Sequence, residues 1–341
     1  MSKLNFSGKR LDILAVDAIG RATRALAYCG CPRKTASMVA EHLVDASLCG
    51  VESHGLMRIL QYVAQFNDGD MIPDASPQFR QGSLGSYEID GNHGIGILSM
   101  NTGVKEGCRL AKENGISAIA IRNTGHTGRL GAFAEQAADQ GCMMIIIGGG
   151  NRKKWPQVAP HGGRQAVFPT NPYCIGIPGG DRGPIVMDFA TAKIAGGWIY
   201  AAKSAGALLP EDAIIDNNGY PSIDPDDYFN GGAILPAGGA KGYSLALVAE
   251  LMAEAMLGPA TTECNWLMIT LNTAVYRESS AMQCIAEEIL EDCRGCPPAA
   301  GFTQVEIPGE RERERKMASR GMIAVPEETW KQILDLDILT D

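Results

Sequence analysis

Three side chains between Glu52 and Leu60 have the types and the spacing for proton chemistry on an anion. The segment ESHGLMRIL places Ser53 beside His54, with Arg58 four residues further on. A histidine titrates near neutral pH and can give or take a proton, while a guanidinium binds a carboxylate through two parallel hydrogen bonds. If His54 begins a helix, Arg58 shares its face, and both can point into one cleft. The alternative is that Ser53 caps a helix and the other two are ordinary surface residues.

Two glycine- or proline-rich loops carry further polar side chains. His126 lies in NTGHTG (Asn123 to Gly128), where the glycines let the backbone come close to a ligand. The alternative for this loop is a structural turn with an incidental histidine. In FPTNP, two prolines flank Thr170 and Asn171, which indicates a stiff loop whose side chains can hydrogen-bond a small ligand.

Two charged residues occupy positions where charge needs a partner. Asp188 ends an otherwise apolar strand, where an unpaired carboxylate would be costly, so we expect it to face a partner, most simply a histidine. Lys241 lies among glycines at the start of a helix, where a cation suits a phosphate or a carboxylate.

The segment from Ser53 to Arg58 needs neighbouring helices to hold its side chains in place. Val39, Leu43, Val44 and Leu48 recur at three- to four-residue spacing and predict an amphipathic helix over 34–48. A helix over 11–30 precedes it, and a third runs from the Ser53 turn through Phe66. Asn67 to Asp70 ends the third helix.

The middle of the chain predicts an α/β arrangement. Short buried strands at 116–122 and 142–148 flank a helix that ends near Gln140. Before them we predict a strand from Ser86, a turn at Asp90 and Gly91, and a helix over 99–114. Gly94-Ile95-Gly96 lacks the third glycine and the acidic residue of a dinucleotide fingerprint, so it does not indicate a Rossmann site.

The later segments complete the expected elements. Strands at 174–177 and 185–189 flank a turn, and a helix covers 242–256. VEIPGE (305–310) predicts a strand and a turn. The following run RERERKMASRG is typical of a solvated helix.

Composition narrows the class of protein. The 341 residues are 45% hydrophobic and 20% charged, and 39 acidic against 30 basic residues give a net charge of -9. This indicates a folded chain of about two domains and argues against nucleic acid as the main partner. Ten cysteines without zinc spacing suggest free thiols in a reducing cytoplasm. The first ten residues lack a signal peptide, no run is long enough to span a membrane, and no metal site is expected.

Taken together, these segments resemble the malate/L-lactate dehydrogenase family of the second type, which is unrelated to Rossmann lactate dehydrogenases. The resemblance covers nearly the whole chain in the family's order. The matching segments are ESHG-x-x-R (Glu52 to Arg58), NTGHTGRLG (Asn123 to Gly131), FPTNP (Phe168 to Pro172), MDFATA (Met187 to Ala192), LPAGGAKGYSLAL (Leu235 to Leu247) and IPGE (Ile307 to Glu310).

The resemblance implies a mixed α/β fold with a non-Rossmann NAD(P)-binding domain on a largely antiparallel sheet, and a helical and mixed domain formed by both termini. The implied domains are 1–120 with 300–341 for substrate and dimer contacts, and 121–299 for the cofactor. A homodimer is implied, with no nucleic acid and no membrane partner. The site should then lie between the two domains.

The resemblance also implies roles for individual residues. Ser53, His54 and Asp188 resemble a relay that delivers a proton, with Asp188 favouring the charged form of His54. Arg58, His126 and Thr170 resemble substrate-binding residues. The implied cofactor contacts are His126, Thr127, Gly128, Asp188, Phe189, Ala190, Lys241, Pro308, Gly309, Glu310, Arg311 and Arg313.

The implied activity is hydride transfer between a nicotinamide and the second carbon of a small 2-hydroxy or 2-keto acid, as for malate or lactate. An alternative is reduction of a cyclic 2-imino acid such as pyrroline- or piperideine-2-carboxylate, and another is a non-catalytic metabolite-binding protein. The cofactor is NADP or NAD, and arginines within Arg311 to Arg315 favour NADP. Pro259 to Leu271 departs from the family pattern, so the resemblance does not define part of the nicotinamide or substrate pocket.

Overall fold

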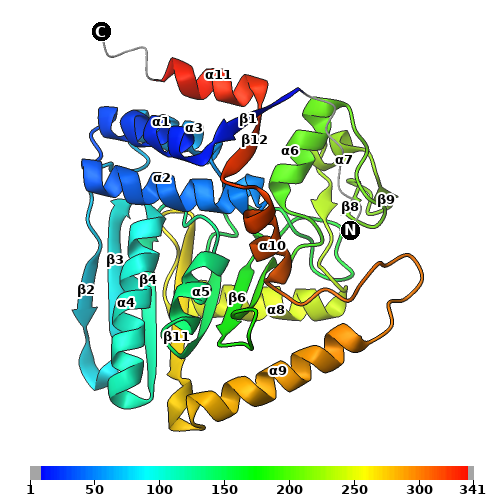
Figure 1. The fold of residues 1–341 in the computed structure, drawn as a ribbon. Helices are drawn as coiled ribbons and strands as arrows, with labels where there is room; N and C mark the ends of the chain where they lie inside the picture. Colours follow the sequence, from blue (N-terminus) through cyan, green and yellow to red (C-terminus); the bar gives the residue numbers. More distant parts are fainter. Residues whose placement is uncertain (1–8, 337–341) are drawn as a thin grey trace. The chain divides into compact units, whose positions relative to one another are not determined.

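The computed structural model describes residues 9–336, and these divide by packing into two units. Unit 1 contains Ile147–Tyr173 and Phe189–Leu267 with residues 9–10, and unit 2 contains Leu11–Ile146, Cys174–Asp188 and residues 268–336. Figure 1 traces the elements along the chain.

The helices and strands alternate along the chain. The helices are α1 (Ala15–Tyr28), α2 (Arg33–Leu48), α3 (Arg58–Asn67), α4 (Gly96–Asn114), α5 (Gly131–Ala138), α6 (Gly196–Ala205), α7 (Pro225–Phe229), α8 (Ala240–Glu250), α9 (Ser279–Gly295), α10 (Glu310–Ala318) and α11 (Glu327–Asp335). The strands are β1 (Arg10–Leu14), β2 (Gln78–Gln81), β3 (Tyr87–Gly94), β4 (Ile116–Thr124), β5 (Cys142–Gly149), β6 (Pro172–Ile177), β7 (Ile185–Ala190), β8 (Ile214–Ile215), β9 (Pro221–Ser222), β10 (Ala233–Ile234), β11 (Cys264–Asn272) and β12 (Met322–Pro326).

A helical layer in unit 2 carries the Ser53 segment. Helix α1 packs on both α2 and α3, and α11 from the end of the described chain packs on α1 and α3 (Figure 1). Leu26, Leu43 and Ile59 are fully buried in this layer. The apolar spacing that predicts α2 is therefore the face that packs, which holds the segment after α2 on a firm base.

The largest sheet has the strand order β2-β3-β4-β11-β5-β6-β7. Strand β2 pairs with β3 in the antiparallel sense and β3 with β4 in the parallel sense, so the sheet is mixed. Helix α4 lies along β3 and β4 (Figure 1). The predicted strands on either side of α5 are thus both present, but β11 lies between them in the sheet. These elements confirm the predicted mixed α/β class.

Unit 1 has its own apolar core. Helix α6 and the small sheet β10-β8-β9 surround buried side chains that include Val158, Phe168, Ile199 and Ile214. Phe168 is the first residue of FPTNP, so burial of its ring anchors the loop that carries Thr170.

Four local predictions are wrong. Residues 10–14 form β1, which pairs with β12, so the first helix begins only at Ala15. Strand β3 continues through the predicted turn at Asp90 and Gly91 with an irregular register. Residues 305–309 form no strand, and α10 begins at Glu310. His54 begins no helix, as the next section describes.

The predicted functional domains differ from the division by packing, because 121–146 and 268–299 pack within unit 2. Packing does not test where a cofactor binds, so the functional bounds stay a prediction. Among residues 9–336 no helix combines the length and apolarity that a membrane crossing needs. The prediction on a signal peptide concerns residues 1–10, of which 1–8 lie outside the described residues.

Candidate functional site

Ser53 and His54 lie in a single 3-10 turn, Glu52–His54, between α2 and α3. The turn is fixed by α2, because the backbone N–H of Leu56 donates to the hydroxyl of Ser47 at 2.9 Å. Gly55 lies so close to that hydroxyl that a Cβ there would approach it to 2.3 Å. Ser53 Oγ lies 2.9 Å from His54 Nδ1. The turn therefore holds the two side chains together, as predicted.

Arg58 begins α3 and does not share a helix with His54, so the predicted i,i+4 arrangement is wrong. The half-buried guanidinium instead folds back on the turn, where Nε donates to the carbonyl of Ser53 at 2.5 Å and Nη1 donates to Gln61. Arg58 still reaches the two histidines electrostatically, because it contributes to the pKa of both His54 and His126.

His54 stacks on His126, with ring centroids 5.2 Å apart and planes inclined by 29°. Burial, followed by the charge of Arg58 and the neighbouring His42, lowers the pKa of His54 to about 4. The same causes hold the pKa of His126 well below its ordinary value. Both imidazoles are therefore neutral at pH 7.

The surroundings of His126 select one tautomer. Its Nδ1 accepts the backbone N–H of Gly128 at 3.3 Å and lies 2.8 Å from the hydroxyl of Tyr62. An N–H donor requires a lone pair on Nδ1, so the proton of the neutral ring belongs on Nε2. That nitrogen is buried and has no hydrogen-bond partner within the described residues. His126 thus keeps an unused N–H donor next to His54.

His42 supports the same loop from α2. Its Nε2 accepts the backbone N–H of Arg129 at 3.1 Å, and its ring stacks on Phe133 at 5.0 Å. Gly128 has a φ of +73°, and a Cβ there would lie 2.3 Å from His42 Nε2, so the close approach requires glycine. Thr127 is buried beside it. The loop around His126 is therefore held from both sides.

Asp188 is placed differently from the prediction. Its Oδ2 accepts the backbone N–H of Gly131 at 2.7 Å, at the start of α5, where helix N–H groups lack intrahelical partners. Removal of water by the surrounding protein atoms raises the pKa of Asp188 to about 6, and the N–H of Gly131 and the charge of Arg129 oppose this rise.

The structure contains no hydrogen bond between Asp188 and His54 among residues 9–336, and Asp188 is not among the groups that shift the pKa of His54. The expected direct pairing, and the expected shift toward a charged histidine, are therefore wrong. The physical reason is that a helix N-terminus supplies the donor that we expected from a histidine.

The segment from Pro308 to Arg313 packs on β7. The N–H of Val186 donates to the carbonyl of Pro308 at 3.2 Å, and Arg313 Nη1 donates to the carbonyl of Pro184 at 2.8 Å. Gly309 has a φ of +90°. Glu310 is ion-paired with Arg294, and Arg311 with Glu306 and Glu312. The arginines of this run are thus already engaged, and Arg313 Nη2 is buried without a partner in the described chain.

The remaining predicted residues belong to unit 1. Thr170 is half-buried, Phe189 is 41% exposed, and Ala190 is half-buried. Lys241 is exposed in the first turn of α8, after two glycines with positive φ. These positions suit ligand contacts within that unit.

Sequence reasoning missed three residues. Tyr62 and His42 occupy helix faces that read as apolar packing, and Glu250 reads as the polar side of α8. Only a three-dimensional contact distinguishes them, although a tyrosine nine residues after Ser53, and on the buried face of α3, was a usable signal.

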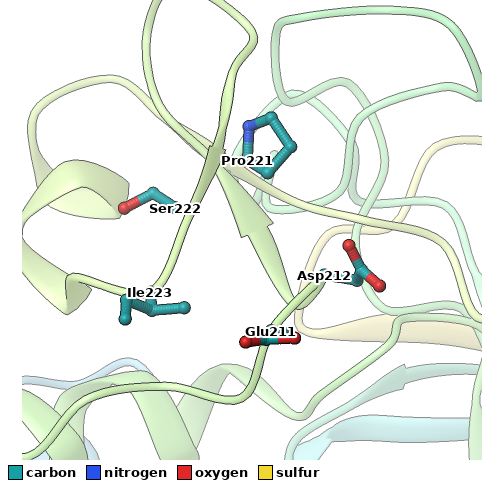
Figure 2. A pocket seen from close by; sticks show the side chains of 5 residues that line it. All are labelled: Glu211, Asp212, Pro221, Ser222 and Ile223. Carbon is teal, nitrogen blue, oxygen red and sulfur yellow. The ribbon is translucent and has the colours of Figure 1, made fainter.

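A depression of about 390 Å³ lies elsewhere in unit 1 and is lined by Glu211, Asp212, Pro221, Ser222 and Ile223 (Figure 2). None of the predicted site residues lines it. Its acidic side chains and open form do not suit an anionic substrate.

Comparisons with known proteins identify the family of this chain. A family model described as malate/L-lactate dehydrogenase matches residues 16–334. The chain is 36% identical over 238 residues to (2R)-3-sulfolactate dehydrogenase (NADP(+)) of Chromohalobacter salexigens, covering 70% of this chain and 69% of the relative. It is 29% identical over 315 residues to ureidoglycolate dehydrogenase (NAD(+)) of Escherichia coli, covering 87% and 88%.

A solved structure has the same fold. The crystal structure of delta1-piperideine-2-carboxylate reductase from Pseudomonas syringae pvar. tomato superposes with a TM-score of 0.83 at 26% identity, covering 96% of this chain and 99% of that one. With the Ser53-His54 turn, the His126 loop and the family match over 16–334, the chain belongs to the malate/L-lactate dehydrogenase family of nicotinamide-dependent oxidoreductases.

Proposed function

We propose that this protein transfers a hydride between a nicotinamide and the second carbon of a small 2-hydroxy or 2-keto acid, using Ser53, His54, Arg58 and His126 at the reacting centre. The observation that carries the proposal is the stacked pair His54 and His126, with an unused Nε2–H donor on His126 and Arg58 beside it. A donor and a cation at one place suit a molecule that has both a carbonyl and a carboxylate.

Arg58 binds the substrate carboxylate in this proposal. Its charge lowers the pKa of His54, so an anion that pairs with Arg58 would offset that effect and raise the pKa. Substrate binding and proton affinity are then coupled. His54 accepts the hydroxyl proton when a 2-hydroxy acid is oxidised and returns it to the oxygen when the keto acid is reduced, with Ser53 holding Nδ1.

His126 donates its Nε2–H to the substrate oxygen and acts as a neutral hydrogen-bond donor. Tyr62 and Gly128 keep the proton on Nε2. Thr170 is a further substrate contact. Asp188 assists through the loop, since it binds Gly131 and not His54.

The cofactor-binding residues that we propose fit a bound nicotinamide dinucleotide in one respect that the structure supports. Gly309 has a positive φ, and a Cβ at this position would lie 3.1 to 3.3 Å from atoms of Arg313 and Val186, so the backbone here has no room for a side chain. The Nη2 atom of Arg313 is buried and has no hydrogen-bond partner within the described residues. The proposed contacts are His126, Thr127, Gly128, Asp188, Phe189, Ala190, Lys241, Pro308, Gly309, Glu310, Arg311 and Arg313. When bound, the nicotinamide would supply or accept the hydride.

For the finer choice between cofactors we propose NADP. Exposed Arg311 in α10 supports this choice, although two glutamates partly offset its charge. The ratio of kcat/KM with NADPH to kcat/KM with NADH tests it, and a ratio below one contradicts it.

A cyclic 2-imino acid is the second candidate, and the lowered pKa of His54 favours it. At a pKa of about 4, His54 is a poor proton donor at pH 7 until an anion binds, whereas a protonated imine brings its own proton. Reduction of pyrroline-2-carboxylate should therefore depend less on His54 than reduction of pyruvate does.

The experiment mixes purified protein with NADPH or NADH and then with about ten 2-keto and 2-imino acids. We expect cofactor fluorescence to change on binding, and the absorbance of the reduced nicotinamide to fall only after an acid is added. Binding without turnover of any acid would favour a non-catalytic metabolite-binding protein.

We also propose a homodimer in the cytoplasm. Helix α8 and the π-helical segment Leu251–Met256 that follows it expose Leu247, Val248, Leu251 and Met256, an apolar surface that suits the same surface of a second copy. Free cysteines suit a reducing compartment. Light scattering of wild type and Leu251→Glu tests the dimer, which the charge should weaken.

A further inference from the structure

Glu250, at the end of α8, has a buried carboxylate whose recorded partners are all donors. Oε2 accepts the backbone N–H of Gly150 at 3.0 Å and the side-chain amide of Asn171 at 2.8 Å, and Oε1 accepts the backbone N–H of Arg152 at 3.1 Å. A carboxylate is the side chain that accepts three such bonds without offering a donor in return. Glu250 is 4% exposed; the bonds from Gly150 and Asn171 are buried, and the bond from Arg152 is partly buried.

The main chain around this carboxylate is packed too closely for side chains. A Cβ on Gly149 would lie 2.8 Å from Asn171 Nδ2 and 2.9 Å from Glu250 Oε2. Gly150 has a φ of +93°. The two glycines let the chain between β5 and Arg152 pass directly over the carboxylate.

Asn171 connects this carboxylate to the loop that carries Thr170. Its φ is +40°, a left-handed conformation that asparagine tolerates better than most residues. On the other side of the loop, the carbonyl of Thr170 accepts from both the backbone N–H and the hydroxyl of Thr191 at 3.0 Å. The hydroxyl of Thr170 makes no hydrogen bond within residues 9–336, so the backbone is held while the side chain is left for a ligand.

A local change in the helix accompanies this placement. The helix changes to π geometry at Leu251–Met256, directly after Glu250, and Asn265 donates to the carbonyls of Ala253 and Gly258. Short π segments are common at functional sites. Glu254, one turn after Glu250, makes only a partly exposed ion pair with Arg152.

We propose that Glu250 is a positioning residue that sets the main chain on both sides of its carboxylate, Gly150 to Arg152 and Thr170 to Asn171, so that Thr170 presents its hydroxyl to the ligand. This inference rests on the proposed function, because it uses Thr170 as a substrate contact. Glu250 itself touches neither substrate nor cofactor.

The test compares Glu250→Gln with Glu254→Gln as a matched control on the same helix. Glutamine must turn its NH2 toward one of the three donors, so the loop should shift, and kcat/KM for the best acid should fall by about tenfold. The KM for the reduced cofactor should change less than kcat. Glu254→Gln removes the same charge and weakens the side-chain ion pair with Arg152, but it removes no hydrogen bond to the main chain of 150–152 or 170–171, so it should retain wild-type kinetics.

A double-mutant cycle separates positioning from general stability. Thr170→Val alone should lower kcat/KM, but added to Glu250→Gln it should cost little more, because a misplaced hydroxyl has already lost its contact. If the fold losses in kcat/KM of the two single variants multiply in the double variant, the inference is overturned. If Glu250→Gln does not fold, Asn171→Gly keeps the positive φ, removes one donor, and should give the same non-additivity more mildly.

Amide hydrogen exchange tests the loop without activity. In Glu250→Gln, peptides covering 147–152 and 166–173 should exchange faster while those from α2 and α4 do not. Unchanged exchange in both segments would overturn the positioning role even if no acid is turned over. Failure of the proposed function, in contrast, would appear in the wild type as absence of turnover with every acid.

Discussion

His126 and Glu250 are both buried polar side chains, but they differ in how many of their polar side-chain atoms are hydrogen-bonded. Glu250 accepts three hydrogen bonds that account for both of its oxygens. His126 uses Nδ1 and leaves Nε2 buried and unpaired among the described residues. A buried donor or acceptor without a hydrogen bond costs about 1–3 kcal/mol, so a folded protein keeps such a group only where another interaction offsets that cost. In this pair, the paired carboxylate of Glu250 holds the backbone, whereas the unpaired Nε2 of His126 is the group that we propose binds the substrate.

The largest expected effect concerns His54, which stacks on His126. His54→Asn keeps polarity but cannot transfer a proton near neutral pH, so kcat for reduction of a 2-keto acid should fall by roughly 10²- to 10⁴-fold. The melting temperature should change little if the histidines serve chemistry and not packing. Stopped assays with pyruvate, oxaloacetate and pyrroline-2-carboxylate measure this, and the loss should be much smaller for the imino acid. Full activity on every keto acid would sink the proton-transfer role.

A smaller loss is expected at Arg58. Arg58→Lys keeps the charge but loses the planar fork, and kcat/KM should fall about a hundredfold, as expected for about 2 to 3 kcal/mol of a bidentate contact. Cofactor affinity, measured by fluorescence, should stay near the wild-type value. An unchanged kcat/KM would show that the carboxylate binds elsewhere.

A Tyr62 variant tests which ring nitrogen of His126 carries the proton. Tyr62→Phe removes the hydroxyl that lies 2.8 Å from His126 Nδ1, so the proton is held less firmly on Nε2, and kcat/KM should fall about tenfold. The matched control is Tyr173→Phe, which removes a hydroxyl bond to the carbonyl of Leu245 in unit 1. If both variants lose the same activity, the effect belongs to general packing and not to His126.

The smallest effect concerns stability against pH. The pKa is lowered to about 4 for His42 and His54 and lies well below its ordinary value for His126, so the unfolded chain binds protons first as the pH falls below 6.5. The free energy of unfolding should therefore decrease between pH 6.5 and 4, by about 1 to 3 kcal/mol for each of His42 and His54, and His126 acts in the same direction. Asp188 has the opposite effect, because its pKa is raised to about 6. As the pH falls from 6 toward the ordinary pKa of an aspartate, the folded state binds this proton first, which increases the free energy of unfolding.

Urea unfolding at pH 7, 5.5 and 4.5 measures this dependence. His42→Gln can still accept the N–H of Arg129 but does not titrate, so its curve should be flatter than that of the wild type. A wild-type stability that is constant over this range would contradict the neutral, buried state of the three histidines.

Much of the fold followed from local patterns in the chain. The spacing of Val39, Leu43 and Val44 predicts α2, and the apolar runs after Ile116 and Cys142 predict β4 and β5, because burial of one helix face or a whole strand leaves a periodic trace in sequence. Strand β1 was missed because it pairs with β12, more than 300 residues away, and nothing local distinguishes such a strand from a helix start.

The sequence by itself also determined which side chains have the chemical types for proton transfer and anion binding, since Ser53, His54, Arg58 and His126 stand in short motifs. Tertiary structure alone decided their partners. Asp188 pairs with the Gly131 N–H at a helix start, His54 stacks on His126, and Glu250 holds Asn171 from 79 residues away. The physical reason is that residue type fixes what a group can donate or accept, whereas its pKa and its partners depend on burial and distance, which arise only when remote segments pack.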